Sequence, residues 1–285
     1  MSFDFLQPDS LSGALEALAA YGDEAKVLAG GTAVVLMLQQ RLIAPAALIN
    51  IERVPDLNYI NLKPEGMHIG PLTKLRDIER STAIQEHCPL LSQTCGEVAN
   101  VRIRNQATLG GNLAEADYAS DPPTTLLALE AQVTTTSVRG TRCLALQDFH
   151  IGFFTTTLEP DELITDIFIP ACPLESRMTY LKYKSRSSED RPCTGVAALA
   201  AFDGKTCTEL RLAVGAACEV PQRLPNIENM AKGQTLNDEL VGEIAAGYAE
   251  SIETLEDIRG SAWYRTQMIR THVQRVLEDV RNGHR

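Results

Sequence analysis

The chain has 285 residues, of which 44% are hydrophobic and 22% charged, and its formal net charge is −11 at pH 7. This length allows two or three small domains, and the composition is ordinary for a folded globular protein. The acidic balance argues against a nucleic-acid-binding surface, which needs clustered Lys and Arg. No apolar run approaches the roughly 20 residues that cross a bilayer, so we predict no membrane span.

The cysteines and histidines form no pattern typical of a metal site. The seven cysteines are scattered without a C-x-x-C pair, and the five histidines without an H-x-x-x-H pair. We therefore predict reduced thiols and no metal on this chain. The N-terminus, Met-Ser-Phe-Asp-Phe, lacks the basic start and apolar core of a signal peptide, so we expect a cytoplasmic protein.

The first 55 residues predict a compact βαβ unit with a right-handed crossover between parallel strands. Ser10 or Ser12 is a suitable N-cap for the first helix. The expected elements are helix 10–21, strand 25–29, helix 32–40 and strand 47–51.

Two further units follow. From residue 56 we expect a hairpin (59–62 and 67–70), helices 72–81 and 88–99, a turn at Gly110-Gly111, helix 121–130, and strands 132–137, 142–146 and 163–169. After a linker at 170–173, the pattern predicts strands 179–184, 195–202 and 209–216, then helices 224–232, 238–251 and 260–280. Three strands followed by three helices indicate a separate small α+β domain.

Two glycine pairs are the most informative local features. Gly30-Gly31 leads from a predicted strand into a predicted helix, and Gly110-Gly111 follows the predicted helix 88–99. Because glycine has no Cβ, the backbone at both places can approach a ligand closely. Two such loops suggest a dinucleotide whose phosphates are held by backbone amides.

Each loop also has a purely structural interpretation. The first lacks the spacing of a Rossmann turn or a P-loop, and a glycine pair there is more often only a tight turn, although Thr32 can cap the next helix. The second is more specific, because Thr108, Asn112 and Asp121 surround its glycines. Asp121 can cap a helix, accept a hydrogen bond from a ribose hydroxyl, or do both, since a carboxylate has spare lone pairs.

Other candidate residues are less specific. Arg102 and Arg104 fit either phosphate contacts or packing on a helix surface, and a strand lysine such as Lys182 is usually solvated. Trp263, the only tryptophan, is expected in the core or in a subunit contact. No Ser–His–Asp, Cys–His or paired-carboxylate arrangement stands out, so we predict no catalytic side chain.

In combination, these segments resemble the FAD-binding medium subunit of molybdenum hydroxylases, the family of xanthine dehydrogenase and aerobic carbon monoxide dehydrogenase. The resemblance covers nearly the whole chain, and the ordered set of motifs is specific. The segments are Ala29-Gly-Gly-Thr32, Ile103-Arg-Asn105, Thr108-Leu-Gly-Gly-Asn112, Ala116-Asp-Tyr-Ala-Ser-Asp121, Asp148-Phe149, Leu158-Glu-Pro-Asp-Glu-Leu163, Ile167-Phe-Ile-Pro170, Tyr180-Leu-Lys182 and Ala213-Val-Gly-Ala216.

The resemblance implies an α+β protein: a two-subdomain FAD-binding fold of the vanillyl-alcohol-oxidase (PCMH) type (1–55 and 56–172), then a small C-terminal domain (173–285) with a three-stranded antiparallel sheet and helices. The glycine loops would wrap the pyrophosphate, Asp121 would hold a cofactor hydroxyl, Ile164 would pack near the flavin and Lys182 would lie near its polar edge. The residues expected at FAD are Ala29, Gly30, Gly31, Thr32, Ala33, Thr108, Leu109, Gly110, Gly111, Asn112, Asp121, Ile164 and Lys182.

Two positions depart from the family pattern. The family commonly has Pro where this chain has Tyr118, and His, Asn or Thr where it has Glu115. If Glu115 faces the isoalloxazine, its negative charge would disfavour the anionic reduced flavin.

The resemblance further implies a division of labour between subunits. A large molybdenum–pterin subunit would oxidise the substrate, and a small subunit with two [2Fe–2S] clusters would pass electrons to FAD on this chain, in a dimer of heterotrimers. FAD would then reduce NAD⁺, a quinone, oxygen or another acceptor. The alternatives are a free-standing flavin oxidoreductase, which needs a substrate pocket with a base, and a nucleotide-binding scaffold that has lost flavin.

Overall fold

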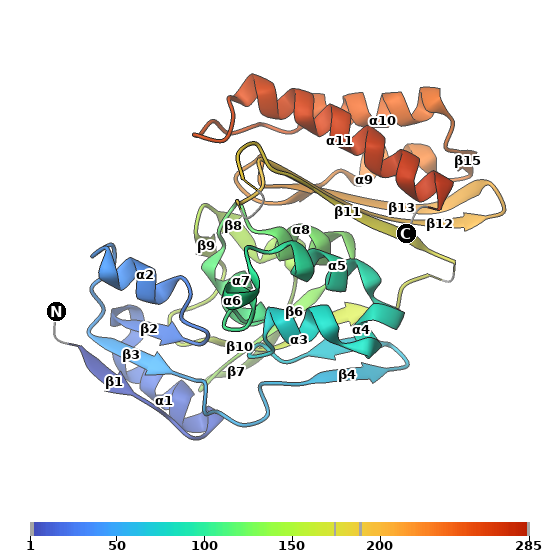
Figure 1. Cartoon of the computed structure of the whole chain (residues 1–285). Helices are drawn as coiled ribbons and strands as arrows, with labels where there is room; N and C mark the ends of the chain where they lie inside the picture. Colours follow the sequence, from blue (N-terminus) through green and yellow to red (C-terminus); the bar gives the residue numbers. More distant parts are fainter. Residues whose placement is uncertain (1–2, 174, 188–189, 284–285) are drawn as a thin grey trace.

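The computed structural model describes residues 3–173, 175–187 and 190–283. Three larger sheets follow one another along the described chain, each formed mainly by one stretch of sequence, and one two-stranded sheet accompanies them. In Figure 1 the first sheet forms a lobe at one side, the second lies in the centre, and the third lies beneath the two long C-terminal helices. In the described part of the chain, no helix is both long and apolar enough to cross a membrane.

The N-terminal lobe is a parallel three-stranded sheet with the order β1-β3-β2. The predicted elements are present, and Ser10 caps α1 by accepting a hydrogen bond from the Gly13 amide at 3.2 Å. The short strand β1, which pairs with β3, was not predicted. The elements are β1 (Asp4–Leu6), α1 (Leu11–Tyr21), β2 (Ala25–Leu28), α2 (Val34–Gln39) and β3 (Ala47–Asn50).

The central sheet is antiparallel, with the order β4-β5-β10-β6-β7. All five strands were predicted, within a few residues at their ends. They are β4 (Ile60–Lys63), β5 (Gly66–Ile69), β6 (Gln132–Ser137), β7 (Gly140–Ala145) and β10 (Leu163–Pro170). A small hairpin, β8 (His150–Gly152) with β9 (Thr155–Thr156), was not predicted.

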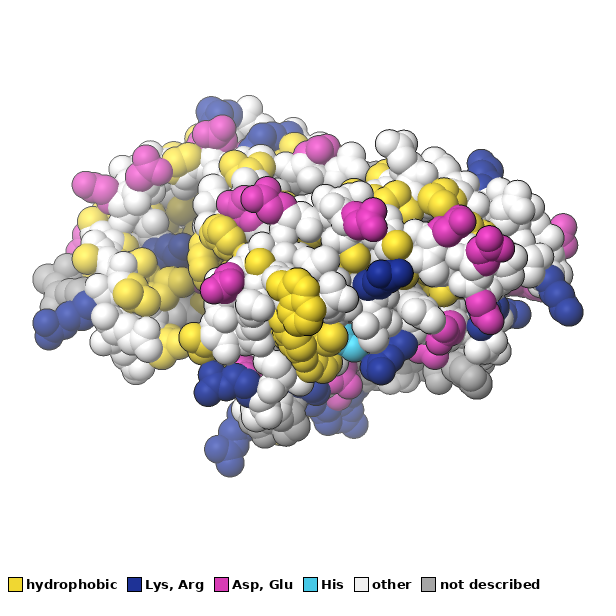
Figure 2. Space-filling view, turned by 90° about the horizontal axis from the view of Figure 1, so that it is seen from above, with side chains coloured by type: hydrophobic (Ala, Val, Ile, Leu, Met, Phe, Trp, Pro, Cys, Tyr) yellow, Lys and Arg dark blue, Asp and Glu magenta, His cyan; other side chains and the backbone are white. Residues whose placement is uncertain are grey.

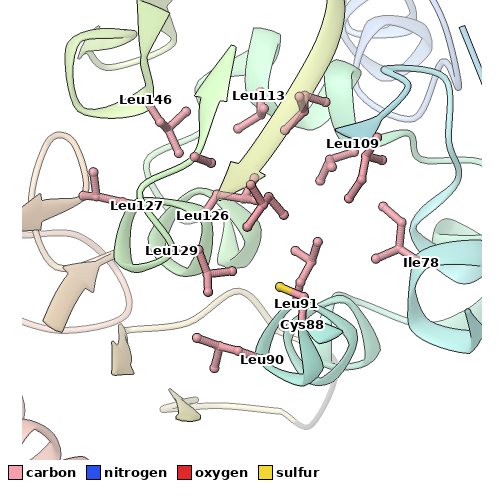
Figure 3. Packing of buried hydrophobic residues seen from close by; sticks show 14 of the residues in the cluster. Ile78, Cys88, Leu90, Leu91, Leu109, Leu113, Leu126, Leu127, Leu129 and Leu146 are labelled. Carbon is pink, nitrogen blue, oxygen red and sulfur yellow. The ribbon is translucent and has the colours of Figure 1, made fainter. Parts of the chain in front are cut away.

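Six helices lie between β5 and β6 in the chain: α3 (Leu75–Arg80), α4 (Thr82–His87), α5 (Pro89–Glu97), α6 (Val101–Arg104), α7 (Leu109–Glu115) and α8 (Asp121–Ala128). Apolar side chains of every one of these helices except α6 form one buried cluster with the central sheet, and Figure 3 shows leucines of α5, α7 and α8 converging there. The predicted start of a helix at Leu72 is wrong, because α3 begins at Leu75; the Leu72 amide bonds the carbonyl of Leu57 at 2.8 Å.

The C-terminal sheet has the three predicted antiparallel strands, β11 (Arg177–Tyr183), β12 (Thr194–Asp203) and β13 (Thr206–Gly215), extended by the two-residue strands β14 (Gln222–Arg223) and β15 (Gln234–Thr235). One face packs on α5 and α8 and the other on α10 (Asp238–Ser251) and α11 (Ala262–Asn282) (Figure 1). The predicted helix 224–232 consists of α9 (Pro225–Glu228) and a 3-10 turn. Burial on both faces explains the Ala-rich, almost continuously apolar sequence of β12.

Trp263 lies in the first turn of α11 with 72% of its surface exposed. It is not a core residue of this chain. Of the two predicted roles, only the subunit contact fits this exposure.

Candidate functional site

The two glycine loops lie side by side. The first glycine loop (residues 29–33) connects β2 to α2, and the second glycine loop (residues 108–112) begins α7. A Cβ built on Gly30 would lie 1.9 Å from the carbonyl oxygen of Gln106, and one built on Gly111 would lie 3.9 Å from the Cβ of Ala29. Only glycine at position 30 therefore permits this close contact between the backbones.

The first glycine loop presents unused backbone donors. The amides of Gly30, Gly31, Thr32 and Ala33 find no hydrogen-bond partner within the described ranges. Gly31 has φ +74°, whereas Ala33 is right-handed helical. Left- and right-handed residues are the conformations from which anion-binding backbone loops are built. Ala33 occupies the N-cap position of α2 and no side chain caps this helix, so the prediction that Thr32 caps it is wrong.

In the second glycine loop the amides from Leu109 to Asn112 are already bonded. They donate to the carbonyls of Pro71, Thr73 and Thr108 and to the Thr108 hydroxyl, at 2.9–3.1 Å. The pair Gly110-Gly111 lies inside the first turn of α7, with Thr108 as N-cap, so the predicted turn here is wrong. A Cβ on Gly110 would lie 2.4 Å from the Cβ of Pro71, and packing therefore requires this glycine.

Asn112 gives the second glycine loop a free side-chain donor. Its Oδ1 accepts a hydrogen bond from the Ser120 hydroxyl at 2.9 Å. This bond fixes the plane of the amide and leaves Nδ2 available, since the amide nitrogen of Asn is a donor. The two walls thus offer backbone N–H groups on one side, and Asn112 with the side-chain-free surface of Gly111 on the other.

Asp121 and Lys182 are brought together, but they form a buried ion pair. The Lys182 Nζ lies 2.8 Å from Asp121 Oδ2 and also donates to the carbonyl of Glu97. The other carboxylate oxygen accepts from the Tyr180 hydroxyl at 2.6 Å. The side chains of Lys182 and Asp121 are 2% and 4% exposed, so the interpretation of Lys182 as a solvated lysine is wrong. Ser120, and not Asp121, occupies the N-cap position of α8.

Burial dominates the protonation equilibria of this cluster. It raises the pKa of the Asp121 carboxyl, while the Lys182 ammonium acts in the opposite direction. It also raises the pKa of Tyr180 well above its usual value. Tyr180 is therefore a neutral donor that fixes the Asp121 carboxylate.

The remaining candidates lie around these groups. Ile164 is 6% exposed in β10 and belongs to the same buried cluster as Leu109 of the second loop. Arg104 donates to Glu79 and to the carbonyl of Val98, which makes it a packing residue, whereas Arg102 is exposed.

Two residues of this region were not singled out from sequence. Tyr180 holds Asp121, and Ser120 orients Asn112. Tyr180 could have been found from sequence, because residues two apart in a strand share one face and Tyr180 therefore lies beside Lys182. Nothing in the local pattern pointed to Ser120.

The molecule is hollowed between the lobe that carries α2 and the main body, at the left of Figure 2. The first glycine loop belongs to the lobe and the second to the main body. The hollow therefore lies beside the place where the two loops contact each other. A cradle of free amides beside a side-chain-free surface fits the pyrophosphate of a dinucleotide.

The comparison with protein families decides between the alternatives. Residues 1–172 match the family described as FAD binding domain in molybdopterin dehydrogenase, and residues 179–280 match the CO dehydrogenase flavoprotein C-terminal domain. The chain belongs to this family. It is an FAD-binding medium subunit of the molybdenum hydroxylase type and part of an oxidoreductase, with the predicted α+β fold.

Individual relatives are similar to this chain over nearly its full length. The chain is 35% identical to the 6-hydroxypseudooxynicotine dehydrogenase complex subunit alpha of Paenarthrobacter nicotinovorans, over 97% of this chain and 93% of the relative. It is 32% identical to the glyceraldehyde dehydrogenase medium chain of Sulfolobus acidocaldarius, over 98% of both chains. A solved structure of carbon monoxide dehydrogenase from Hydrogenophaga pseudoflava superposes with a TM-score of 0.95 at 30% identity, covering 98% of this chain and 97% of the other.

These relatives are subunits of multi-subunit complexes, and their names identify them as medium chains or subunits of dehydrogenases. The prediction of an FAD-binding oxidoreductase subunit is confirmed. The interpretations as a free-standing flavin enzyme and as a scaffold without flavin receive no support from the family.

Proposed function

We propose that this chain carries FAD as the electron-transfer subunit of a molybdenum-containing dehydrogenase. The pyrophosphate would bind the free amides of residues 30–33 on one side, with Gly111 and Asn112 on the other. The observation that carries this assignment is the row of unpaired N–H groups in residues 30–33, beside a loop whose amides from Leu109 to Asn112 are all bonded. Bound FAD supplies redox chemistry, because it accepts electrons singly or in pairs.

The other cofactor residues follow as proposals of the same kind. Ala29, Thr108, Leu109 and Gly110 would shape the walls, and Ile164 would pack near the flavin. Asp121 and Lys182 would lie near its polar parts, and their mutual ion pair would fix their orientation. The corresponding domains would be residues 1–55, 56–172 and 173–285.

The partners we propose are a large molybdopterin-binding subunit and a small subunit with two [2Fe–2S] clusters, assembled as a dimer of heterotrimers. Electrons would enter from the clusters and leave to an external acceptor. Free thiols at all seven cysteines suit a reducing compartment, and we propose the cytoplasm.

Titration of the purified, FAD-free chain with FAD tests the proposal. We expect saturable binding of one FAD per chain, with flavin fluorescence as the measured signal. Purification of the native complex should return two companion chains, one with molybdenum and one with iron. A chain that binds no FAD, or one that turns over a small organic substrate by itself, would contradict the proposal.

A further inference from the structure

Tyr118 lies in the turn that joins α7 to α8, at a position where the family commonly has proline. Its ring contacts Phe153 and Phe154 of the β8–β9 hairpin edge to face, at centroid distances of 5.3 and 6.2 Å. Its hydroxyl donates to Asp257 Oδ2 at 2.8 Å. Asp257 lies between α10 and α11, in the part of the chain that matches the C-terminal family domain. This side chain therefore ties the turn to the C-terminal domain.

The turn between α7 and α8 is held together by its own hydrogen bonds. The Ser120 amide donates to the carbonyl of Asp117 at 2.9 Å, and the Ala119 amide donates to the Asp117 carboxylate at 3.1 Å. The Ser120 hydroxyl in turn fixes the side chain of Asn112. Because these bonds make the turn one unit, a displacement of Tyr118 should also displace Ser120, and with it the Asn112 amide.

Asp257 is a fixed acceptor for the Tyr118 hydroxyl. Its carboxylate also accepts from the Arg259 side chain at 2.8 Å and from the Arg265 guanidinium. Burial opposes the charge of this carboxyl, but hydrogen bonds from the Arg259 amide, Tyr118 and Arg265 hold its pKa well below the usual range. Burial and the bond to Asp257 raise the pKa of Tyr118, so its hydroxyl is a neutral donor.

Arg265 connects the Asp257 carboxylate to the core of the C-terminal domain. Its side chain is fully buried at the beginning of α11 and donates to the carbonyls of Cys193 and Ala216, next to β12 and β13. Moving a buried guanidinium is costly, because each lost partner leaves its charge less compensated. In Figure 1 the beginning of α11 and the β8–β9 hairpin lie at the same side of the molecule. The Tyr118 hydroxyl is therefore bonded to a rigid point of the C-terminal domain.

We propose that Tyr118 is a positioning residue for the FAD site, through which cofactor binding depends on the C-terminal domain. Its hydroxyl holds the α7–α8 turn against Asp257 before FAD binds, so that the Asn112 amide is already oriented. A site that is ordered in advance binds more tightly, because binding then costs less conformational freedom. Proline has no hydroxyl and cannot make this bond. The inference rests on the proposed FAD site.

FAD titrations of the full, FAD-free chain test this role. Tyr118→Phe removes the hydroxyl and keeps the aromatic ring beside the hairpin. We expect a loss of FAD affinity of about three- to tenfold, at most the effect of one hydrogen bond to a charged group. Tyr21→Phe is the matched control, because the Tyr21 hydroxyl donates to Asp4 at 2.7 Å on the surface of the N-terminal lobe. It should bind FAD like the wild type, and thermal unfolding of both FAD-free variants checks folding.

Hydrogen exchange followed by mass spectrometry separates positioning from a purely structural role. Because linkage is reciprocal, saturating FAD should slow the exchange of residues 257–260 in the wild type, and less so in Tyr118→Phe. The reporters are the amides of Asp257 and Gly260, each bonded to the carbonyl of the other at 3.2 Å. In the FAD-free chain, Tyr118→Phe should speed the exchange of residues 117–120.

Unchanged or tighter FAD binding by Tyr118→Phe would overturn the inference. Equal protection of residues 257–260 by FAD in the two proteins, or an equal loss of affinity in Tyr21→Phe, would do the same. If the wild type binds no FAD, the proposed function fails instead. The exchange of residues 117–120 in the FAD-free chains then still shows whether Tyr118 holds the turn.

Discussion

The two glycine loops have similar sequences but opposite uses of their backbone. In residues 29–33 the amides are free and the chain is held only at its ends by β2 and α2. In residues 108–112 every amide from Leu109 to Asn112 is bonded within the protein, and Gly110 is pressed against Pro71. The first loop is therefore built to bind, and the second mainly to stay in place. A glycine pair alone does not distinguish these roles, because close approach to protein and close approach to ligand need the same residue.

The second loop is also tied to the C-terminal sheet. Asn112 bonds Ser120, the next residue is Asp121, and Asp121 is held by Tyr180 and Lys182 of β11. The first glycine loop has no such connection among the described contacts. This difference predicts separate effects of mutation on stability and on binding.

The largest effect is expected for Lys182→Met, which leaves the Asp121 carboxylate buried without its cation. Breaking one side of a buried pair costs about 3–5 kcal/mol of folding free energy, measured by urea unfolding. Lys184→Met is the matched control, because Lys184 pairs at 3.3 Å with the more exposed Glu97 and should lose at most about 1 kcal/mol. Equal losses in the two variants would mean that the buried pair does not anchor this region.

The second-largest effect is expected for Gly30→Ala, which should weaken the binding of the cofactor. The added methyl group would collide with the carbonyl of Gln106 at 1.9 Å and force the two loops apart. We expect about a 100-fold loss of FAD affinity, equivalent to about 2.8 kcal/mol. Gly242→Ala on α10, where nothing lies within 4 Å, should leave binding unchanged. Near-normal FAD affinity in Gly30→Ala would refute the close contact between the loops.

Gly110→Ala should affect stability more than binding. Its methyl group would press on Pro71, and such overpacking costs about 1–3 kcal/mol. Because the amide of Gly110 is not a free donor, the folded variant should bind FAD better than Gly30→Ala does. Titration of the folded variants with FAD measures this difference. A greater loss of FAD affinity in Gly110→Ala than in Gly30→Ala would contradict the proposed roles of the two loops.

The smallest effect is expected for Thr108→Ala, which removes the N-cap of α7. Loss of a cap typically costs about 1 kcal/mol, and thermal unfolding of the FAD-free chain measures it. Thr108→Ser keeps the hydroxyl that accepts from Gly111 and should retain most of that stability. If Ser and Ala destabilise equally, the cap is not the source of the effect.

The sequence was sufficient to predict an element wherever its capping residues and its hydrophobic periodicity agreed. The predicted bounds 238–251 match α10, whose cap Asn237 accepts a hydrogen bond from the Leu240 amide. The family and its cofactor also followed from ordered motifs. The two-residue strands β14 and β15 escaped prediction because pairing with β13 defines them.

Within the candidate site, the wrong predictions concern residues whose conformation or burial depends on contacts with residues far away in the sequence. Gly110-Gly111 forms a helical turn because Pro71 and Thr73 accept its first amides, although they lie far away in sequence. Lys182 is buried because Glu97 and Asp121 surround its ammonium. No local pattern around these residues contains that information.

A crystal structure of the chain with bound FAD tests the central claim most directly. The account predicts pyrophosphate oxygens within hydrogen-bond distance of the amides of residues 30–33, with Gly111 and Asn112 on the opposite wall. A pyrophosphate bound away from residues 30–33, with those amides still free, would contradict it.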